Sequence, residues 1–473
     1  MLPYKNLQEK KELIQKGQLS LKENVQYFLS QIEENKKLNA YNFVFEDAVN
    51  NADEIENKIK NGTGGKLAGM VIAVKDVLAI KAKPLTCSSN ILKGFESLYT
   101  ATAVQKLINE DAILIGKTNC DEFAMGGSNE NSALGPVLNP VNNEYVPGGS
   151  SGGSAAVVAA GLCDAAIGTD TGGSIRQPAS YCGVVGLKPT YGRVSRYGLT
   201  AYASSFDSVG PLTNNIEDAS LLLEVMSGFD EMDSTSINKD AEVFSANLET
   251  DKKFKIGYAK EHFGEGLSEE VKKAIEETIE KLKSLGHEIV EVEFPHTEYS
   301  IATYYILAMA EASANLSRFD GARYGYRADD IKNLDEMYTL SRHDGFGDEV
   351  KRRIMLGTYV LSAGYYDAYY RKAQQVRRLI QNDFFKAFEK VDVVISPTAP
   401  TTAFKLGELM DDPLQMYLMD VYTTPANLAG IPGISIPIGK DSKGLPIGVQ
   451  IMANQLDEAK LLQIGQKVLN SEN

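Results

Sequence analysis

Two glycine- and serine-rich stretches decide the fold of this chain: Gly148-Gly149-Ser150-Ser151-Gly152-Gly153-Ser154 and Thr169-Asp170-Thr171-Gly172-Gly173-Ser174-Ile175-Arg176-Gln177-Pro178. The first leads into residues 155–160, a good helix former, and a loop before a helix can hold an anion. A phosphate loop, however, requires a lysine after its last glycine, and Ala155 follows Ser154 here. The glycine spacing of a dinucleotide-binding fingerprint is also absent. The stretches therefore favour nucleophilic catalysis by serine.

A serine hydroxyl needs a base that accepts its proton, and most serine hydrolases use histidine. This chain has four histidines, all outside the glycine-rich region: His262, His287, His296 and His343. His287 lies beside a predicted strand and His296 follows a proline, so we assign both to structural roles. If Ser174 is a nucleophile, its base is a residue of another type.

Lys75 can be that base. It follows the apolar run at residues 70–74, which predicts a buried strand, so its amine is expected to be partly desolvated. Desolvation lowers the pKa of a lysine and leaves a neutral amine that accepts a proton. A lysine at a strand end is more often simply solvated. The glycines favour the catalytic interpretation, because residues 171–173 can turn several N–H groups toward one point, as an oxyanion hole requires.

The stretch from residue 148 to residue 179 resembles the signature of the amidase signature family almost throughout. The resemblance implies an α/β amidase-signature fold and a catalytic set that matches Lys75, Ser150 and Ser174, with a cis peptide bond at Gly149–Ser150. It implies acyl transfer, in which Lys75 takes a proton from Ser150, and Ser150 takes one from Ser174 as Ser174 attacks an amide carbonyl. The acyl-serine is then hydrolysed.

The same resemblance assigns roles around the nucleophile. It implies that the oxyanion is held by N–H groups of Thr171, Gly172 and Gly173. Asp170 and Arg176 are expected to brace this loop. Ser151 is expected either to contact the substrate or, like Ser154, to support the loop.

Segments outside the signature are similar to one branch of the family, the A subunits of bacterial glutamyl-tRNA(Gln) amidotransferases. These segments lie at residues 121–126, 129–132, 187–198, 317–321 and 349–357. The resemblance implies that the chain hydrolyses glutamine and passes ammonia to a B subunit, which uses ATP and Mg²⁺ to amidate Glu-tRNA(Gln) or Asp-tRNA(Asn). A third chain, the C subunit, joins the two. No cofactor or metal is expected in this chain, and tRNA is expected to bind mainly through the partner.

For glutamine, the branch implies an arginine on the α-carboxylate and an aspartate on the α-amine. Arg353 and Asp420 match these positions, with Arg352 as the alternative to Arg353. Tyr305 is a further pocket candidate, and Tyr304 is an equal contender. Two departures concern local packing: Val141 stands where the branch usually has tryptophan, and Gly127 stands where serine is common.

Composition agrees with this division of labour. The 473 residues carry a net charge of −15, which argues against a broad phosphate-binding face. One basic stretch, residues 371–378, is interpreted as a solvated helix face.

The four cysteines are widely spaced and are predicted to be buried rather than disulfide-bonded. No signal peptide or membrane-spanning run is recognisable, so a cytoplasmic enzyme is expected.

Periodicity predicts a single domain over residues 1–473, with a helical region at residues 1–62 and a mainly helical cap at residues 300–390. Alternating strands and helices predict a large mixed central β-sheet covered by helices on both faces. Near the C-terminus, residues 434–438 and 446–452 predict a hairpin.

Two other functions remain open. A stand-alone amidase acting on other amides would keep the three catalytic residues and have no need for Arg353 and Asp420. A non-catalytic scaffold protein of the same complex would need none of them.

Overall fold

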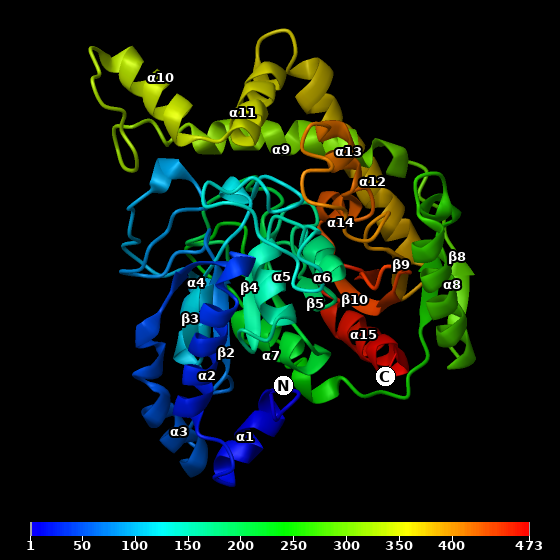
Figure 1. Cartoon of the computed structure of the whole chain (residues 1–473). Coiled ribbons are helices and arrows are strands. Elements are labelled where there is room, and N and C mark those ends of the chain that lie inside the picture. The colour runs from blue at the N-terminus through cyan, green and yellow to red at the C-terminus, as the bar shows by residue number, and fades with distance from the viewer. Residues whose placement is uncertain (1, 473) are drawn as a thin grey trace.

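One mixed β-sheet of eleven strands forms the centre of the molecule, in a computed structural model that describes residues 2–472 (Figure 1). The strand order is β1-β3-β2-β4-β6-β5-β10-β11-β9-β7-β8. Strand β2 is parallel to β3 and β4, β7 is parallel to β8 and β9, and the other pairs are antiparallel. The strands are β1 (Tyr41–Val44), β2 (Val71–Lys75), β3 (Ile113–Thr118), β4 (Ala165–Asp170), β5 (Val185–Lys188), β6 (Ser208–Thr213), β7 (Lys255–Tyr258), β8 (Glu288–Glu291), β9 (Val393–Pro397), β10 (Gly433–Lys440) and β11 (Pro446–Ala453).

Helices cover both faces of this sheet, as predicted. Successive residues of a strand point to opposite faces. In β10, Ile434 and Ile436 face Gly465 on one helix, whereas Gly433 faces Arg176 on another. The described helices are α1 (Leu7–Gln15), α2 (Leu21–Glu34), α3 (Ala52–Asn61), α4 (Thr102–Asn109), α5 (Gly152–Ala159), α6 (Arg176–Cys182), α7 (Ile216–Met226), α8 (Glu269–Ser284), α9 (Ser300–Leu316), α10 (Leu334–Gly345), α11 (Asp348–Leu361), α12 (Lys372–Phe388), α13 (Pro413–Leu418), α14 (Thr424–Ala429) and α15 (Glu458–Glu472).

The neighbouring parallel strands β2 and β4 position the glycine-rich segments. Ile72 pairs with Ala165 and Val74 with Ile167, so both strands end at the same edge of the sheet. All residues of both strands are buried, which is why residues 71–74 and 165–168 carry no polar side chain and show no alternation. Polar groups at the carboxyl ends of such strands lie close together.

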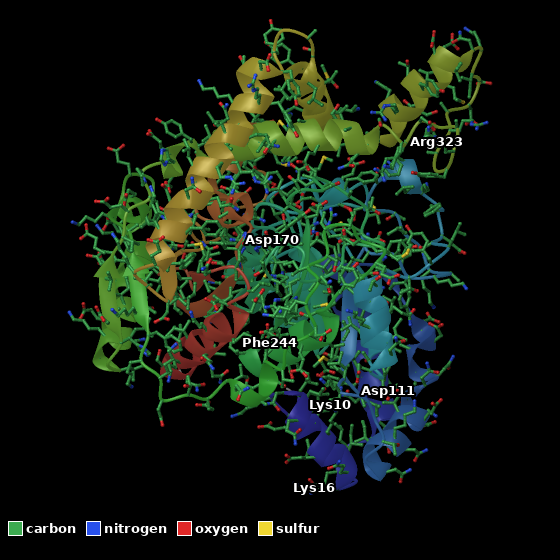
Figure 2. The ribbon with its side chains drawn as sticks, turned by 180° about the vertical axis from the view of Figure 1, so that it is seen from behind. Lys10, Lys16, Asp111, Asp170, Phe244 and Arg323 are labelled. Carbon is green, nitrogen blue, oxygen red and sulfur yellow. The ribbon has the colours of Figure 1, made fainter. Side chains whose placement is uncertain are left out.

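Helices α9 and α11 lie across this edge of the sheet (Figure 1). Between residues 300 and 388 the chain is helical except at residues 317–333, 346–347 and 362–366. Asp170 lies near the middle of the molecule, whereas Lys16 and Arg323 lie at opposite ends of it (Figure 2). The assignment of the whole chain to one domain stays a prediction.

Local sequence accounts for several element boundaries. Ser20 caps α2, with its hydroxyl accepting a hydrogen bond from the N–H of Glu23, and Gly62 ends α3 in a left-handed conformation. The predicted hairpin is β10–β11. Within residues 2–472, no helix is both long enough and apolar enough to cross a bilayer.

Two predictions need correction. The N-terminal region is not wholly helical, because residues 41–44 form β1, which adds an antiparallel edge to β3. The basic stretch at residues 371–378 is not wholly solvated. Arg377 is partly buried over the ring of Phe206, 4.3 Å from its centroid, and donates to Ser205 and to the carbonyl of Leu428. This arginine joins α12 to the body of the protein.

Candidate active site

Lys75, the last residue of β2, lies at the centre of a cluster of hydroxyl groups. Its Nζ donates to Ser150 Oγ at 2.7 Å, to Ser151 Oγ at 2.8 Å and to Thr169 Oγ1 at 2.9 Å. Lys75, Ser150 and Ser151 have no exposed surface. The parallel pairing of β2 with β4 brings Thr169 to the amine, and the loop before α5 supplies the two serines.

Burial favours the neutral form of this amine. No described carboxylate lies within ion-pair distance of Lys75, and burial lowers its pKa to about 8 although Asp121, Asp170 and Asp207 oppose the shift. A neutral amine donates two protons and accepts one. Ser151 already donates to the carbonyl of Thr169 at 3.0 Å. The hydroxyls that remain able to donate to the amine are therefore those of Ser150 and Thr169.

The peptide bond between Gly149 and Ser150 is cis, as the resemblance implied. Ser151, in contrast, uses all the hydrogen bonds of its hydroxyl within the protein. Its buried hydroxyl contacts Lys75, the carbonyl of Thr169 and the N–H of Thr169, which leaves it no free lone pair or proton. We therefore count Ser151 among the residues that hold Lys75 and withdraw its predicted contact with substrate.

Ser174 follows β4 and is 8% exposed, whereas Lys75 and Ser150 have no exposed surface. Its carbonyl accepts a hydrogen bond from the N–H of Ser151 at 3.1 Å, which ties the two glycine-rich segments together. Its hydroxyl forms no hydrogen bond with any residue from 2 to 472, including Ser150. The hydrogen bond between Lys75 and Ser150 is thus formed here, whereas the one between Ser150 and Ser174 is not. Catalytic hydrogen bonds often tighten only when substrate binds.

The loop from Thr171 to Ser174 presents backbone N–H groups beside the nucleophile. The N–H of Gly173 is not one of the free groups, because it donates to Asp170 Oδ1 at 2.9 Å. This corrects its predicted place in the oxyanion hole. The N–H groups of Thr171, Gly172 and Ser174 have no acceptor in the described part of the chain. These three can receive a developing negative charge.

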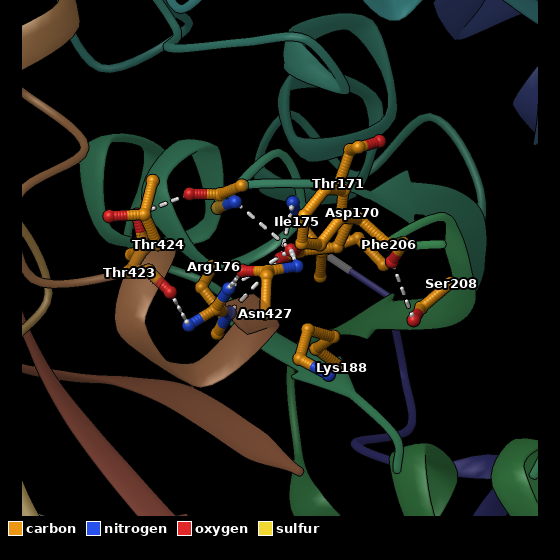
Figure 3. Close-up of polar contacts among 12 residues, drawn as sticks. Asp170, Thr171, Ile175, Arg176, Lys188, Phe206, Ser208, Thr423, Thr424 and Asn427 are labelled. Atoms are coloured by element: carbon orange, nitrogen blue, oxygen red, sulfur yellow. Dashed lines mark hydrogen bonds and ion pairs between the residues drawn. The ribbon is translucent and has the colours of Figure 1, made fainter. Parts of the chain in front are cut away.

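Asp170 braces this loop through Arg176, as predicted (Figure 3). The guanidinium donates to both carboxylate oxygens of Asp170 at 3.0 Å, to Asn427 Oδ1 and to Gln450 Oε1. Burial raises the pKa of Asp170, but the charge and hydrogen bonds of Arg176 outweigh this effect and hold the pKa at about 2. The brace therefore stays charged across the physiological pH range.

Arg353 and Asp420 are a second set of charged groups, and together with Tyr305 they are called the substrate wall. Arg353 on α11 is 3% exposed, donates from Nε to Glu349 at 2.8 Å and from Nη1 to the hydroxyl of Tyr202 at 2.7 Å. Its guanidinium also lies 5.4 Å from the ring centroid of Tyr305 and 5.5 Å from that of Tyr417. These contacts fix the arginine and leave Nη2 without a hydrogen-bond partner among the described residues.

Asp420 precedes α14 and accepts a hydrogen bond from the hydroxyl of Tyr305 at 3.0 Å. Burial raises the pKa of this carboxyl to about 7, while Tyr305 and Arg353 favour its ionised form. A cation bound beside it would favour ionisation further. Arg353, Tyr305 and Asp420 are thus brought together, although α9, α11 and the turn before α14 carry one each.

The structure separates the alternatives that the sequence left open. Both arginines line a cavity of about 240 Å³ and pair with Glu349, but the side chain of Arg352 is 43% exposed, whereas that of Arg353 is 3% exposed. Tyr305 contacts Asp420. Tyr304 instead packs against the oxyanion loop, since a Cβ at Gly172 would lie 2.5 Å from its ring. Both tyrosines belong to the site, on different sides.

Sequence reasoning missed four polar residues of this site: Thr169, Tyr202, Asp207 and Glu349. Glu349 could have been found, because it stands four residues before Arg353 on a helix, the spacing of a salt bridge. Asp207 accepts a hydrogen bond from Thr171 Oγ1 at 2.8 Å, and no local pattern announces that contact.

Comparisons with known proteins agree with this geometry. The model of the amidase family matches residues 23–462. The A subunit of the glutamyl-tRNA(Gln) amidotransferase of Acidobacterium capsulatum is 59% identical over 403 residues, 85% of each chain. The A subunit from Salinibacter ruber is 49% identical over 99% of this chain and all of its own. The crystal structure of the same protein from Thermotoga maritima is 40% identical, with a TM-score of 0.79 over 96% of this chain and 93% of its own.

A more distant structure, the native peptide amidase of Stenotrophomonas maltophilia, is 26% identical with a TM-score of 0.82 over 99% of this chain and 97% of its own. These matches extend over nearly the whole length of the chain. The chain therefore belongs to the amidase family.

Proposed function

We propose that this chain is the glutaminase component of a tRNA-dependent amidotransferase, with Ser174 as nucleophile, Ser150 as relay and Lys75 as base. The carrying observation is the buried Lys75–Ser150 hydrogen bond of 2.7 Å beside Ser174, together with Arg353 and Asp420, which both contact Tyr305. The name and high identity of the relatives, glutamyl-tRNA(Gln) amidotransferase A subunits, support the assignment of substrate and reaction.

Acylation begins with neutral Lys75, which accepts the hydroxyl proton of Ser150. Ser150 takes the proton of Ser174 as Ser174 Oγ forms a bond to the carboxamide carbon of glutamine. The resulting oxyanion is stabilised by the free N–H groups of the loop that ends at Ser174. When this intermediate collapses, the carbon–nitrogen bond breaks, and the leaving amine receives a proton from Lys75 through Ser150. Ammonia and a γ-glutamyl ester of Ser174 result.

Deacylation uses the same relay in the same order. Water attacks the ester carbon and gives a proton to Ser150, which passes one to Lys75. The second tetrahedral intermediate then expels Ser174 Oγ, which regains its proton from Lys75 through Ser150, and glutamate leaves. Each proton taken in one half-reaction is returned in that half-reaction, so no cofactor is needed in this chain.

Glutamine is distinguished from other amides by its two backbone charges. Arg353 presents a fixed guanidinium with a free Nη2 to the α-carboxylate, and Asp420 presents a buried carboxyl to the α-ammonium. An amide that lacks either group would leave Nη2 of Arg353 or the carboxyl of Asp420 without this partner, which makes the set selective for glutamine. Tyr305 touches both recognition residues and orients them.

The ammonia is proposed to pass to a partner, the B subunit, that holds ATP, Mg²⁺ and most of the tRNA contact, with the C subunit joining the two. The net charge of −15 supports this division, because an acidic chain binds a polyanion poorly without help. The choice between Glu-tRNA(Gln) and Asp-tRNA(Asn) lies with the partner. A cytoplasmic location stays a prediction.

The test is Ser174→Ala in the complex assembled with its partner proteins. Glutamine-dependent amidation of tRNA is expected to fall by more than about a thousandfold, whereas amidation supplied with ammonium chloride continues. Ser154→Ala is the matched control, since this buried serine of the same stretch contacts Thr118 and Ile167 rather than Lys75. Glutamine-dependent activity that survives in the Ser174 variant would refute the nucleophile. Efficient hydrolysis of unrelated amides by the isolated chain would favour the stand-alone amidase.

A further inference from the structure

Thr423, one residue before α14, forms a direct contact with the oxyanion loop. The residue has no exposed surface, and its Oγ1 donates to the carbonyl of Gly172 at 2.7 Å. The carbonyl of Asp420 lies farther from the same oxygen, at 3.2 Å, and is already bonded by the hydroxyl and the N–H of Thr424, both at 3.0 Å. A hydroxyl has one proton to donate. The hydroxyl of Thr423 therefore donates its proton to the carbonyl of Gly172.

This hydrogen bond fixes one peptide plane of the loop. The carbonyl of Gly172 and the N–H of Gly173 belong to the same planar unit and point in opposite directions. Thr423 holds the carbonyl, and Asp170 Oδ1 holds the N–H at 2.9 Å. With both ends bonded, the plane cannot rotate. The N–H groups of Gly172 and Ser174 lie on the two neighbouring planes, so each can turn only about the Cα bonds that join it to this fixed plane.

Packing keeps the two segments together. A Cβ at Gly173 would lie 2.2 Å from Thr423 Oγ1 and 2.7 Å from its Cβ, and φ of Gly173 is +138°. Only glycine permits this approach and this conformation. The segment is anchored from behind as well, because Arg176 donates to the carbonyl of Thr423 at 2.9 Å (Figure 3).

The same turn carries Asp420. The N–H of Thr423 donates to the carbonyl of Asp420 at 3.1 Å, so the carboxyl and the hydroxyl project from one rigid turn. A substrate held at Asp420 is thus positioned by the structure that also orients the oxyanion loop. Thr423 itself touches no reacting atom.

We propose that Thr423 is a positioning residue that aligns the oxyanion loop with the substrate-binding turn through its bond to the Gly172 carbonyl. The proposal rests on the proposed function, because it requires Ser174 to be the nucleophile. It makes a separate claim, since an amidase built on Ser174 does not by itself need a hydroxyl at position 423.

Thr423→Val removes the hydroxyl and keeps the shape of the side chain. Loss of one oxyanion donor lowers kcat about 10²–10³-fold, and misdirecting the donors is expected to lower kcat for glutamine by about 10–100-fold. The KM for glutamine is expected to change much less, because Asp420 and its partners remain. Thr423→Ser keeps the hydroxyl and is expected to restore kcat. Thr424→Val is the matched control from the same turn, with a smaller loss, since Thr424 does not contact the loop.

A second readout reports the loop directly. A glutamine analogue with a boronic acid in place of the carboxamide forms a tetrahedral adduct with a nucleophilic serine and so imitates the oxyanion. Its affinity for the complex carrying Thr423→Val is expected to fall in parallel with kcat, while the affinity for glutamate stays near that of the wild type. If the valine variant does not fold, Thr423→Ala replaces it, because alanine removes the hydroxyl and leaves more room.

Three results would overturn the proposal: wild-type kcat in Thr423→Val, equal losses in the valine and serine variants, or parallel losses of affinity for the boronate and glutamate. Each leaves the proposed function intact as long as Ser174→Ala is inactive. An active Ser174→Ala complex would instead refute the proposed function, and the role of Thr423 with it.

Discussion

Raising the pH from about 7 to about 9 is expected to increase kcat for glutamine hydrolysis, because Lys75 acts as a base only when neutral. Burial lowers the pKa of Lys75 to about 8, so the neutral fraction is about one tenth at pH 7 and one half at pH 8. The rate is therefore expected to rise about fivefold between these values and about twofold more by pH 9. With the ordinary lysine pKa of 10.5, only about one molecule in three thousand would be active at pH 7.

The assay is glutamate release by the assembled complex at saturating glutamine, over the pH range in which the complex stays folded. kcat is the informative quantity, since kcat/KM also reports Asp420, whose pKa is about 7, and the amino group of free glutamine. Asp420→Asn is the control. It is expected to raise KM and to leave the midpoint of the kcat profile near 8. A kcat that is flat between about pH 6.5 and 9 would refute Lys75 as the base.

Three further predictions concern the substrate wall and the loop. Arg353→Lys is expected to raise the KM for glutamine about 10–100-fold in a steady-state assay, since charge-assisted hydrogen bonds contribute roughly 1.5–3 kcal/mol. Arg352→Lys, at the more exposed arginine, is expected to change KM less than about threefold in the same assay. Tyr305→Phe is expected to raise KM by about fivefold. It is also expected to raise the pKa of Asp420, because the lost hydrogen bond favoured the carboxylate; the acidic limb of the pH profile of kcat/KM would then shift to higher pH. Gly173→Ala is expected to lower the melting temperature and abolish glutamine hydrolysis, because a Cβ would lie 2.2 Å from a buried hydroxyl; normal melting and activity would show that the loop can move aside.

The sheet and the position of Lys75 could be predicted from local sequence. The run before Lys75 is apolar at every position because β2 is buried on both faces, and that pattern distinguishes a central strand from an edge strand. The edge strand β1 was missed for the converse reason. Its residues, Tyr41–Val44, are partly exposed and follow two helices, so nothing local marks them as part of the sheet. Pairing with β3 makes them a strand.

The site was predicted more completely in its residue types than in its contacts. Arg353 and Asp420 were chosen by resemblance, and the structure brings both to Tyr305. Ser151 and Gly173 were given roles that the structure does not support. In each case the deciding fact is a hydrogen bond within the protein, to Lys75 and to Asp170, that occupies the atom in question. Sequence shows which polar atoms exist and not which remain free.

By itself, the sequence determined the amidase family and the α/β architecture, because apolar periodicity and the glycine-serine pattern are local properties of the chain. Tertiary structure decided the lowered pKa of Lys75, which N–H groups before Ser174 are already bonded, and the deeper burial of Arg353 than of Arg352. Each of these depends on burial or on a partner distant in sequence, as with the bond from Thr423 to Gly172, 251 residues away. Only folding creates the low-polarity surroundings in which such contacts fix a charge and a geometry.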